Sequence, residues 1–170
     1  LHLARTTIFN NTTAAGIANT SGGQVSIADS TIVSNSSVFG GGGVLSLSGS
    51  GVITITNSAI ISNTGTVGGG LIVFGGALTI TNSTLTGNTA GVFGGAMDGT
   101  VLHNCVLSAN SAPTGGATIG GAGYNCTLTG NSATVRGGAS SGTPLSNCII
   151  YDNIAPVEPN YSGGNLDYCC

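Results

Sequence analysis

Apolar and polar residues alternate in short stretches that recur along the chain. Between residues 78 and 86 the apolar side chains are Leu78, Ile80 and Leu85, and threonines stand between them. An alternation with period two is typical of a β-strand with one buried face, because a helix repeats its apolar positions every three or four residues. The alternation of apolar and polar residues shifts by one position at Asn82. The pattern therefore predicts two short strands on either side of a bend at this asparagine.

Other stretches align with this one and repeat its core face. In the unit that closes at Asn88, we expect the inward side chains to be Leu78, Ile80, Ser83 and Leu85, and the outward ones to be Thr79, Thr81, Thr84 and Thr86. The corresponding inward positions of two earlier units are Val25, Ile27, Ser30, Ile32 and Ile53, Ile55, Ser58, Ile60. Each unit therefore presents the same apolar face to a shared core.

A short string, Asn-Ser/Cys-x-Ile/Leu-x-x-Asn, marks most units. The closing asparagines, spaced by 21 to 28 residues, are Asn11, Asn35, Asn63, Asn88, Asn110, Asn131 and Asn153. Two short strands, a bend and a glycine-rich return in a repeat of this length are typical of a parallel β-helix. We predict an all-β fold, a single parallel β-helix domain over residues 1–170 with about seven coils and a partial eighth.

Asparagines at two positions of the repeat are expected to stack into ladders. One set consists of the closing asparagines, and the other stands at the bend: Asn57, Asn82, Asn104, Asn125 and Asn147. Asparagine tolerates the left-handed backbone that tight bends need, and its amide both donates and accepts hydrogen bonds. We interpret both sets as structural.

Serine and cysteine share a further column. Its members are Ser30, Ser58, Ser83, Cys105, Cys126, Cys148 and, one period later, Cys169. A buried free cysteine packs like a small apolar residue, and a reactive thiol needs neighbours that lower its pKa. We therefore expect interior packing rather than nucleophiles or metal ligands. A disulfide between stacked cysteines stays open, because spacing does not fix the direction of the side chains.

The tetrapeptide Val-Phe-Gly-Gly occurs at residues 38–41, 73–76 and 92–95. Glycine loops that hold phosphate lead into the N-terminus of a helix, and no helical pattern follows these copies. We predict turns of the glycine-rich return, with Phe39, Phe74 and Phe93 packed on one another or covering a corner. Stacking of these rings on a sugar is the alternative.

Charge is scarce in this chain and limits its partners. Only 4% of the residues are charged, the net charge is -3, and Arg5 and Arg136 are the basic residues. Binding to nucleic acid needs a basic patch, so we exclude it as a function. No apolar run reaches the ~18 residues of a membrane-spanning helix. We expect no membrane span in this chain.

The acidic residues are too dispersed for the known chemistry of polysaccharide-cleaving β-helices, which needs clustered carboxylates. They are Asp29, Asp98, Asp152, Glu158 and Asp167. Of these, Asp152, Glu158 and Asp167 can approach one another near the C-terminal end, and Asp98 shares a coil with His103. We expect no catalytic residue, no cofactor and no metal ion, and hence no enzyme.

Outward threonine pairs at positions 54/56 and 79/81 resemble the flat arrays of ice-binding solenoids. The same column continues with Val101, His103, Ala122 and Tyr124, which interrupts the array. We therefore do not predict ice binding.

Tetrads of the type Gly-Gly-Ala-apolar, at residues 75–78 and 94–97, are paired with an apolar-x-x-Asn tetrad in each coil. This pairing resembles the repeats of chlamydial polymorphic outer-membrane proteins and of other bacterial secreted right-handed parallel β-helix proteins. The resemblance covers roughly residues 6–153, with Ile or Leu where the former family usually has Phe. It implies a right-handed solenoid that is exported and displayed on the cell surface.

We therefore expect a non-enzymatic extracellular β-solenoid that serves as a surface stalk, an adhesin or a subunit of a self-assembling filament. A carbohydrate-binding or polysaccharide-degrading β-helix is the alternative. Uncapped solenoid ends expose strand edges, and no charged cap is evident near Leu1 or Cys170. The expected partners are further copies stacked end to end, other parts of a longer surface protein, or glycans. We expect specificity in the longer inserts at residues 36–51, 64–76 and 155–164.

Overall fold

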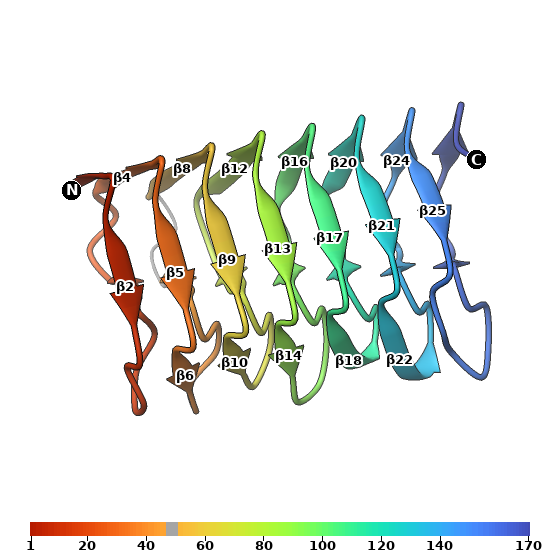
Figure 1. Ribbon diagram of the computed structural model, residues 1–170, viewed down its shortest axis with the longest axis horizontal. Coiled ribbons are helices and arrows are strands. Elements are labelled where there is room, and N and C mark those ends of the chain that lie inside the picture. Colours follow the sequence, from red (N-terminus) through yellow and green to blue (C-terminus); the bar gives the residue numbers. More distant parts are fainter. Residues whose placement is uncertain (47–50) are drawn as a thin grey trace.

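A computed structural model describes residues 1–46 and 51–170 (Figure 1). The described chain consists of strands and turns, with no helix. All paired strands are parallel, and they form four sheets that follow the axis of a right-handed solenoid. Figure 1 shows the coils side by side, from the N-terminal coil in red to the C-terminal coil in blue. The predicted fold class is confirmed.

Two of the sheets contain the two strands that the alternation predicts for each coil. Sheet A has the order β1 (His2–Ala4), β4 (Gln24–Ala28), β8 (Val52–Thr56), β12 (Ala77–Thr81), β16 (Val101–His103), β20 (Ala122–Tyr124), β24 (Leu145–Ser146) and β27 (Leu166–Asp167). Sheet B has the order β2 (Thr7–Phe9), β5 (Thr31–Val33), β9 (Ala59–Ile61), β13 (Thr84–Thr86), β17 (Val106–Ser108), β21 (Thr127–Thr129) and β25 (Ile149–Tyr151). The predicted bend lies between sheets A and B.

The glycine-rich return is not a single loop, and this corrects the expected coil. Sheet D contains β6 (Ser36–Ser37), β10 (Thr64–Gly65), β14 (Thr89–Ala90), β18 (Ser111–Thr114) and β22 (Ser132–Arg136). Sheet C contains β3 (Ile17–Asn19), β7 (Val44–Ser46), β11 (Leu71–Val73), β15 (Met97–Asp98), β19 (Thr118–Ile119), β23 (Ser140–Ser141) and β26 (Tyr161–Ser162). Most of these strands have two or three residues, which is too short for a period of two to show in the sequence.

The core is formed by apolar side chains that stack in register from coil to coil. Ile53 pairs with Leu78 and Ile55 with Ile80 in sheet A, and all four are buried. Full burial of such a side chain contributes about 1.5–3 kcal/mol relative to exposure. The predicted inward positions of the three aligned units are all buried, whereas Thr84 is exposed. The inward and outward faces were therefore assigned correctly.

Glycine pairs occur in two different turns, which corrects their assignment to one return stretch. Gly75 and Gly76 lie between sheets C and A, where Ala77 donates its N–H to the carbonyl of Gly51. Gly94 and Gly95 lie between sheets D and C, where the N–H of Gly69 bonds to Gly94. The two tetrads of the resemblance are thus not equivalent positions. Both turns bring backbones too close for a side chain, so glycine recurs in each.

The inserts at residues 36–51 and 64–76 are largely part of the coil rather than projecting loops. They contain strands of sheets D and C, and they bury Leu45 and Ile72 in a small second core with Ala15. Residues 47–50 of the first insert lie outside the described residues.

Candidate functional site

The closing asparagines form a continuous ladder, as predicted, and those from Asn35 to Asn153 are buried. The side chain of Asn110 uses its full bonding capacity there. Its Nδ2 donates to Leu85 O at 2.8 Å and to Asn131 Oδ1 at 2.9 Å, and its Oδ1 accepts from Asn88 N at 2.9 Å and from Asn88 Nδ2 at 3.0 Å. Asn35, Asn63, Asn88 and Asn131 make the same Nδ2-to-Oδ1 bond to the next coil. The ladder therefore links successive coils along the axis.

Both ends of the ladder are defined. At the N-terminal end, Nδ2 of the exposed Asn11 donates to Asn35 Oδ1 at 2.8 Å. At the other end, Asn153 Nδ2 donates to Asn160 Oδ1 at 3.1 Å. Asn160 follows Asn153 by only seven residues, so it takes the place of a next-coil asparagine from within the same turn. The repeat in the sequence does not indicate Asn160, because this residue falls outside the period.

A left-handed residue precedes every asparagine of the buried ladder. These residues, all with positive φ, are Asn10, Ser34, Ser62, Gly87, Ala109, Gly130 and Asp152. A single residue in this conformation turns the chain sharply at the end of sheet B and directs the next side chain inward. The sequence hides this column, because its members share a backbone conformation and no side-chain chemistry.

The predicted bend asparagines also have left-handed backbones, with φ from 48° to 54°, and are exposed. Nδ2 of one donates to Oδ1 of the previous one at 3.1 Å from Asn104 to Asn82, 3.2 Å from Asn125 to Asn104 and 2.7 Å from Asn147 to Asn125. Asn57 Nδ2 donates instead to Asp29 Oδ1 at 3.3 Å. Within the described part of the chain, no hydrogen bond joins Asn57 to Asn82. The exposed ladder is therefore interrupted at this step.

A shallow groove of about 470 Å³ lies at that interruption. It spans three coils at the bend between sheets A and B. Its lining consists of Asp29, Ser30, Thr31, Asn57, Ser58, Ala59, Asn82 and Thr84. The sequence could place these residues in columns but could not indicate that the ladder opens between two of its members.

The cysteine column lies inside the solenoid, as predicted. Cys105, Cys126 and Cys148 are buried, Cys169 is half-buried, and the five thiols are free, which answers the disulfide question. The backbone N–H of Cys126 donates to Cys148 Sγ at 3.4 Å. Each buried Sγ donates to the carbonyl two residues earlier, at 3.2 to 3.3 Å.

The buried thiols influence one another's pKa. The hydrogen bond with Cys105, together with burial, raises the pKa of Cys126 to about 11. The same kind of bond with Cys126, followed by burial, raises the pKa of Cys148, whereas the bond from Cys126 lowers that of Cys105. Burial and raised pKa values make Cys126 and Cys148 poor nucleophiles.

The carboxylates are distributed around the coil. Asp152 follows β25 in sheet B, Glu158 precedes β26 in sheet C, and Asp167 ends β27 in sheet A, so the structure does not bring these three together. Asp98 lies in β15 of sheet C, where burial raises its pKa. His103 belongs to β16 of sheet A, a different sheet. Residues 1–46 and 51–170 contain no group of three or more His, Cys, Asp or Glu arranged to hold a metal ion.

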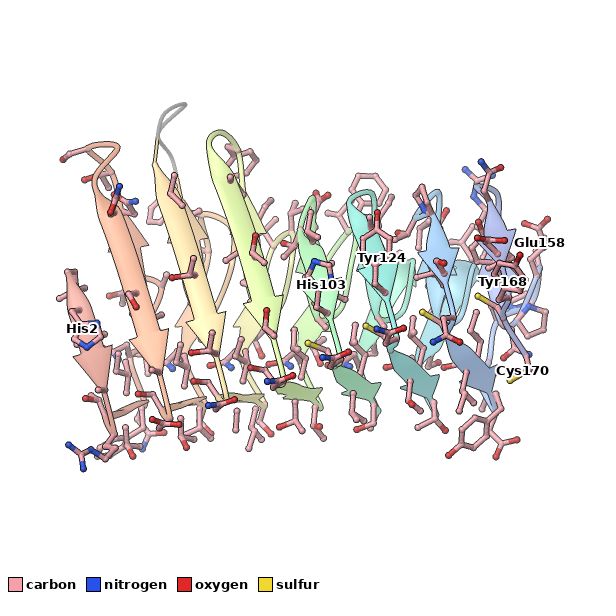
Figure 2. All side chains as sticks on the ribbon, turned by 90° about the horizontal axis from the view of Figure 1, so that it is seen from above. His2, His103, Tyr124, Glu158, Tyr168 and Cys170 are labelled. Atoms are coloured by element: carbon pink, nitrogen blue, oxygen red, sulfur yellow. The ribbon has the colours of Figure 1, made fainter. Side chains whose placement is uncertain are left out.

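The aromatic side chains are mostly on the surface. Phe39, Phe74 and Phe93 are 74%, 59% and 40% exposed. Phe39 and Phe93 lie in the turn between sheets D and C, and Phe74 lies in the turn between sheets C and A. The ring pair that stacks is His103 with Tyr124, whose centroids are 5.0 Å apart on neighbouring strands of sheet A (Figure 2). The sequence places both residues in one column of sheet A, but the stacking of their rings was not predicted.

No helix in the described part of the chain is long and apolar enough to cross a membrane.

No protein-family profile, no curated protein and no solved structure matches the chain. The observed parallel β-solenoid agrees with the fold that the resemblance to bacterial surface repeat proteins implies. No match shows that the chain belongs to that family.

Proposed function

We propose that this protein is a non-enzymatic structural β-solenoid that acts outside the cell, as the shaft of a surface stalk or adhesin or as a subunit of a filament. The observation that carries this proposal is the buried asparagine ladder. It runs from Asn11 to Asn153, is closed by Asn160, and joins each coil to the next through paired amides.

The ladder is suited to a mechanical role. In a solenoid each coil contacts only its neighbours, so the contacts between adjacent coils determine how well the stack withstands bending and stretching. Asn63, Asn88, Asn110 and Asn131 are fully buried, and each donates Nδ2 both to a carbonyl and to the next asparagine. Hydrogen bonds in a dry interior are stronger than in water, and breaking them leaves buried polar groups without partners.

An extracellular location is supported by the resemblance to exported surface repeats. Antibodies against the purified protein should label intact cells of the source organism. Labelling that appears only after the cells are permeabilised would contradict the location.

The non-enzymatic part of the proposal is tested by incubation with a panel of neutral and acidic polysaccharides. We expect no new reducing ends and no unsaturated uronate products. Turnover at roughly 1 s⁻¹ or faster, which is typical of enzymes, would favour the alternative of a polysaccharide-degrading β-helix.

The filament form is tested separately, by electron microscopy and sedimentation of the isolated chain over a range of concentrations. Rods that lengthen with concentration support end-to-end stacking. Strictly monomeric behaviour at high concentration would rule out the filament and leave the stalk or adhesin.

A further inference from the structure

We propose that the groove at the bend between sheets A and B binds a neutral oligosaccharide. The groove follows the coils that contain β4 and β5, β8 and β9, and β12 and β13. This inference goes beyond the structural role and does not depend on it.

The hollow arises because a small residue interrupts a column of larger ones. The first outward position of sheet B is occupied in chain order by Thr7, Thr31, Ala59, Thr84, Val106, Thr127 and Ile149. Ala59 is paired in register with Thr31 on one side and Thr84 on the other. Its methyl group therefore forms a low floor between two threonine side chains. A floor of this kind suits the C–H face of a sugar ring.

The polar groups beside this floor are available to a ligand. Elsewhere along the bend, Asn82, Asn104, Asn125 and Asn147 are joined by amide bonds. Asn57 and Asn82 both line the groove, and Asn82 Nδ2 and Asn57 Oδ1 make no hydrogen bond to the described residues, so one donor and one acceptor are free there. A hydroxyl group both donates and accepts, and it can therefore bond to both amides. The Asp29 carboxylate adds a strong acceptor for a second hydroxyl.

The charge and shape of the groove select among ligands. Asp29 is the one charged side chain among the residues that line it. An anionic sugar, a phosphate or a nucleic acid would be repelled there, because no basic side chain lines the groove to pair with it. A protein partner is disfavoured, since protein hot spots need deep pockets for aromatic or aliphatic anchors. An uncharged sugar ring is not repelled by Asp29, and hydroxyl groups on its adjacent carbons can bond to the two amides and to the carboxylate.

The decisive variant is Ala59→Thr, which fills the floor with the residue that occupies this column in neighbouring coils. The matched control is Ala122→Thr, on the outer face of sheet A, where Thr54 and Thr79 occupy the same column. Both changes fit a strand, and thermal unfolding of the two variants verifies that they fold. The probes are neutral gluco-, galacto- and manno-oligosaccharides, with sulfated and uronate oligosaccharides for comparison, titrated by NMR and calorimetry.

We expect at least one neutral oligosaccharide to bind saturably and to shift the side-chain amide signals of Asn57 and Asn82. Ala59→Thr should weaken this binding at least tenfold, and Ala122→Thr less than twofold. Asn57→Gly keeps the left-handed backbone and removes the amide, so it should weaken binding about five- to tenfold. The matched change Asn125→Gly should leave binding unaltered.

Three results would overturn the inference. They are the absence of saturable binding by every neutral oligosaccharide at concentrations up to roughly 10 mM, equal binding by the two threonine variants, and preferential binding of the anionic sugars. None of these results would affect the structural role, which is contradicted by polysaccharide turnover instead.

Discussion

Replacing Asn110 with aspartate tests the buried ladder with a change of almost no volume. The carboxylate can still accept the two hydrogen bonds from Asn88. The oxygen that replaces Nδ2, however, faces Leu85 O and Asn131 Oδ1, which are both acceptors. Two buried acceptors lose a donor, and an unpaired charge is buried at a site with no exposure to solvent. Protonation of the aspartate restores one of the two donated bonds.

The expected effect depends on pH in a defined direction. Burial without a cationic partner raises the pKa of the introduced carboxyl in the folded state above its unfolded value of about 3.9. The folded state then holds the proton more tightly, so stability is greatest below pH ~4 and falls as pH rises toward the folded pKa. At pH 4 we expect a loss of about 1–3 kcal/mol, from the one donated hydrogen bond that the protonated side chain does not restore and from imperfect geometry; Asn131 Oδ1 keeps its bond from the backbone N–H of Asn110. Above that, each pH unit should cost about 1.4 kcal/mol more.

Asn104→Asp is the matched control, because Asn104 belongs to the same coil but is exposed at the bend. It should change stability by about 1 kcal/mol or less at both pH values, because the bond that it loses is accessible to water. The assay is urea unfolding at pH 4 and pH 7, followed by circular dichroism. The same dependence on pH in the two variants, or a cost of Asn110→Asp below about 1 kcal/mol at pH 7, would contradict the stabilising role of the buried ladder.

Three further predictions concern backbone, packing and thiols. Ala109→Gly should stabilise the fold by about 0.5–1 kcal/mol in urea unfolding, because Ala109 has φ of 53° and glycine relieves this strain; a loss of stability would contradict it. Gly116→Ala should cost about 3 kcal/mol or more, because its Cβ would collide with the carbonyl of Gly138, whereas the open position Gly23→Ala should change the unfolding midpoint little. With an aromatic disulfide reagent at pH 8, the exposed Cys170 should react first, and the three buried thiols should react only after denaturant is added; rapid reaction of all five in the folded state would be inconsistent with the column.

The sequence was most informative where long side chains repeat in register. Sheets A and B were predictable because apolar residues such as Ile55, Ile80 and Leu102 recur at the same position in most coils. The closing asparagines were identifiable for the same reason, since an amide that bonds to its own kind must recur at each period. Their burial and their bonds then followed from the stacking.

Other features depend on backbone geometry that side chains do not reveal. Sheets C and D were missed because their strands are short and glycine carries no side chain to mark a face. The left-handed column that includes Ser62, Gly87 and Ala109 was missed because unlike residues share one conformation. Asn160 was missed because it closes the ladder outside the period. The missing amide bond beside the groove at Ala59 was not predicted, because only the three-dimensional placement of Asn57 and Asn82 shows that their side chains do not bond.

Distances between spin labels measure whether successive coils stack in register along one axis. Labels at the outward sheet B positions Thr7, Thr31, Thr127 and Ile149, in a chain whose cysteines are replaced by serine, give three pairs for pulsed electron paramagnetic resonance. Along the strand order of sheet B, the pairs 31/127, 7/127 and 7/149 are separated by four, five and six coils. At about 4.8 Å per coil, coils stacked in register give distances of about 19, 24 and 29 Å. Unequal increments, or a 7/149 distance no longer than that of 31/127, would contradict it.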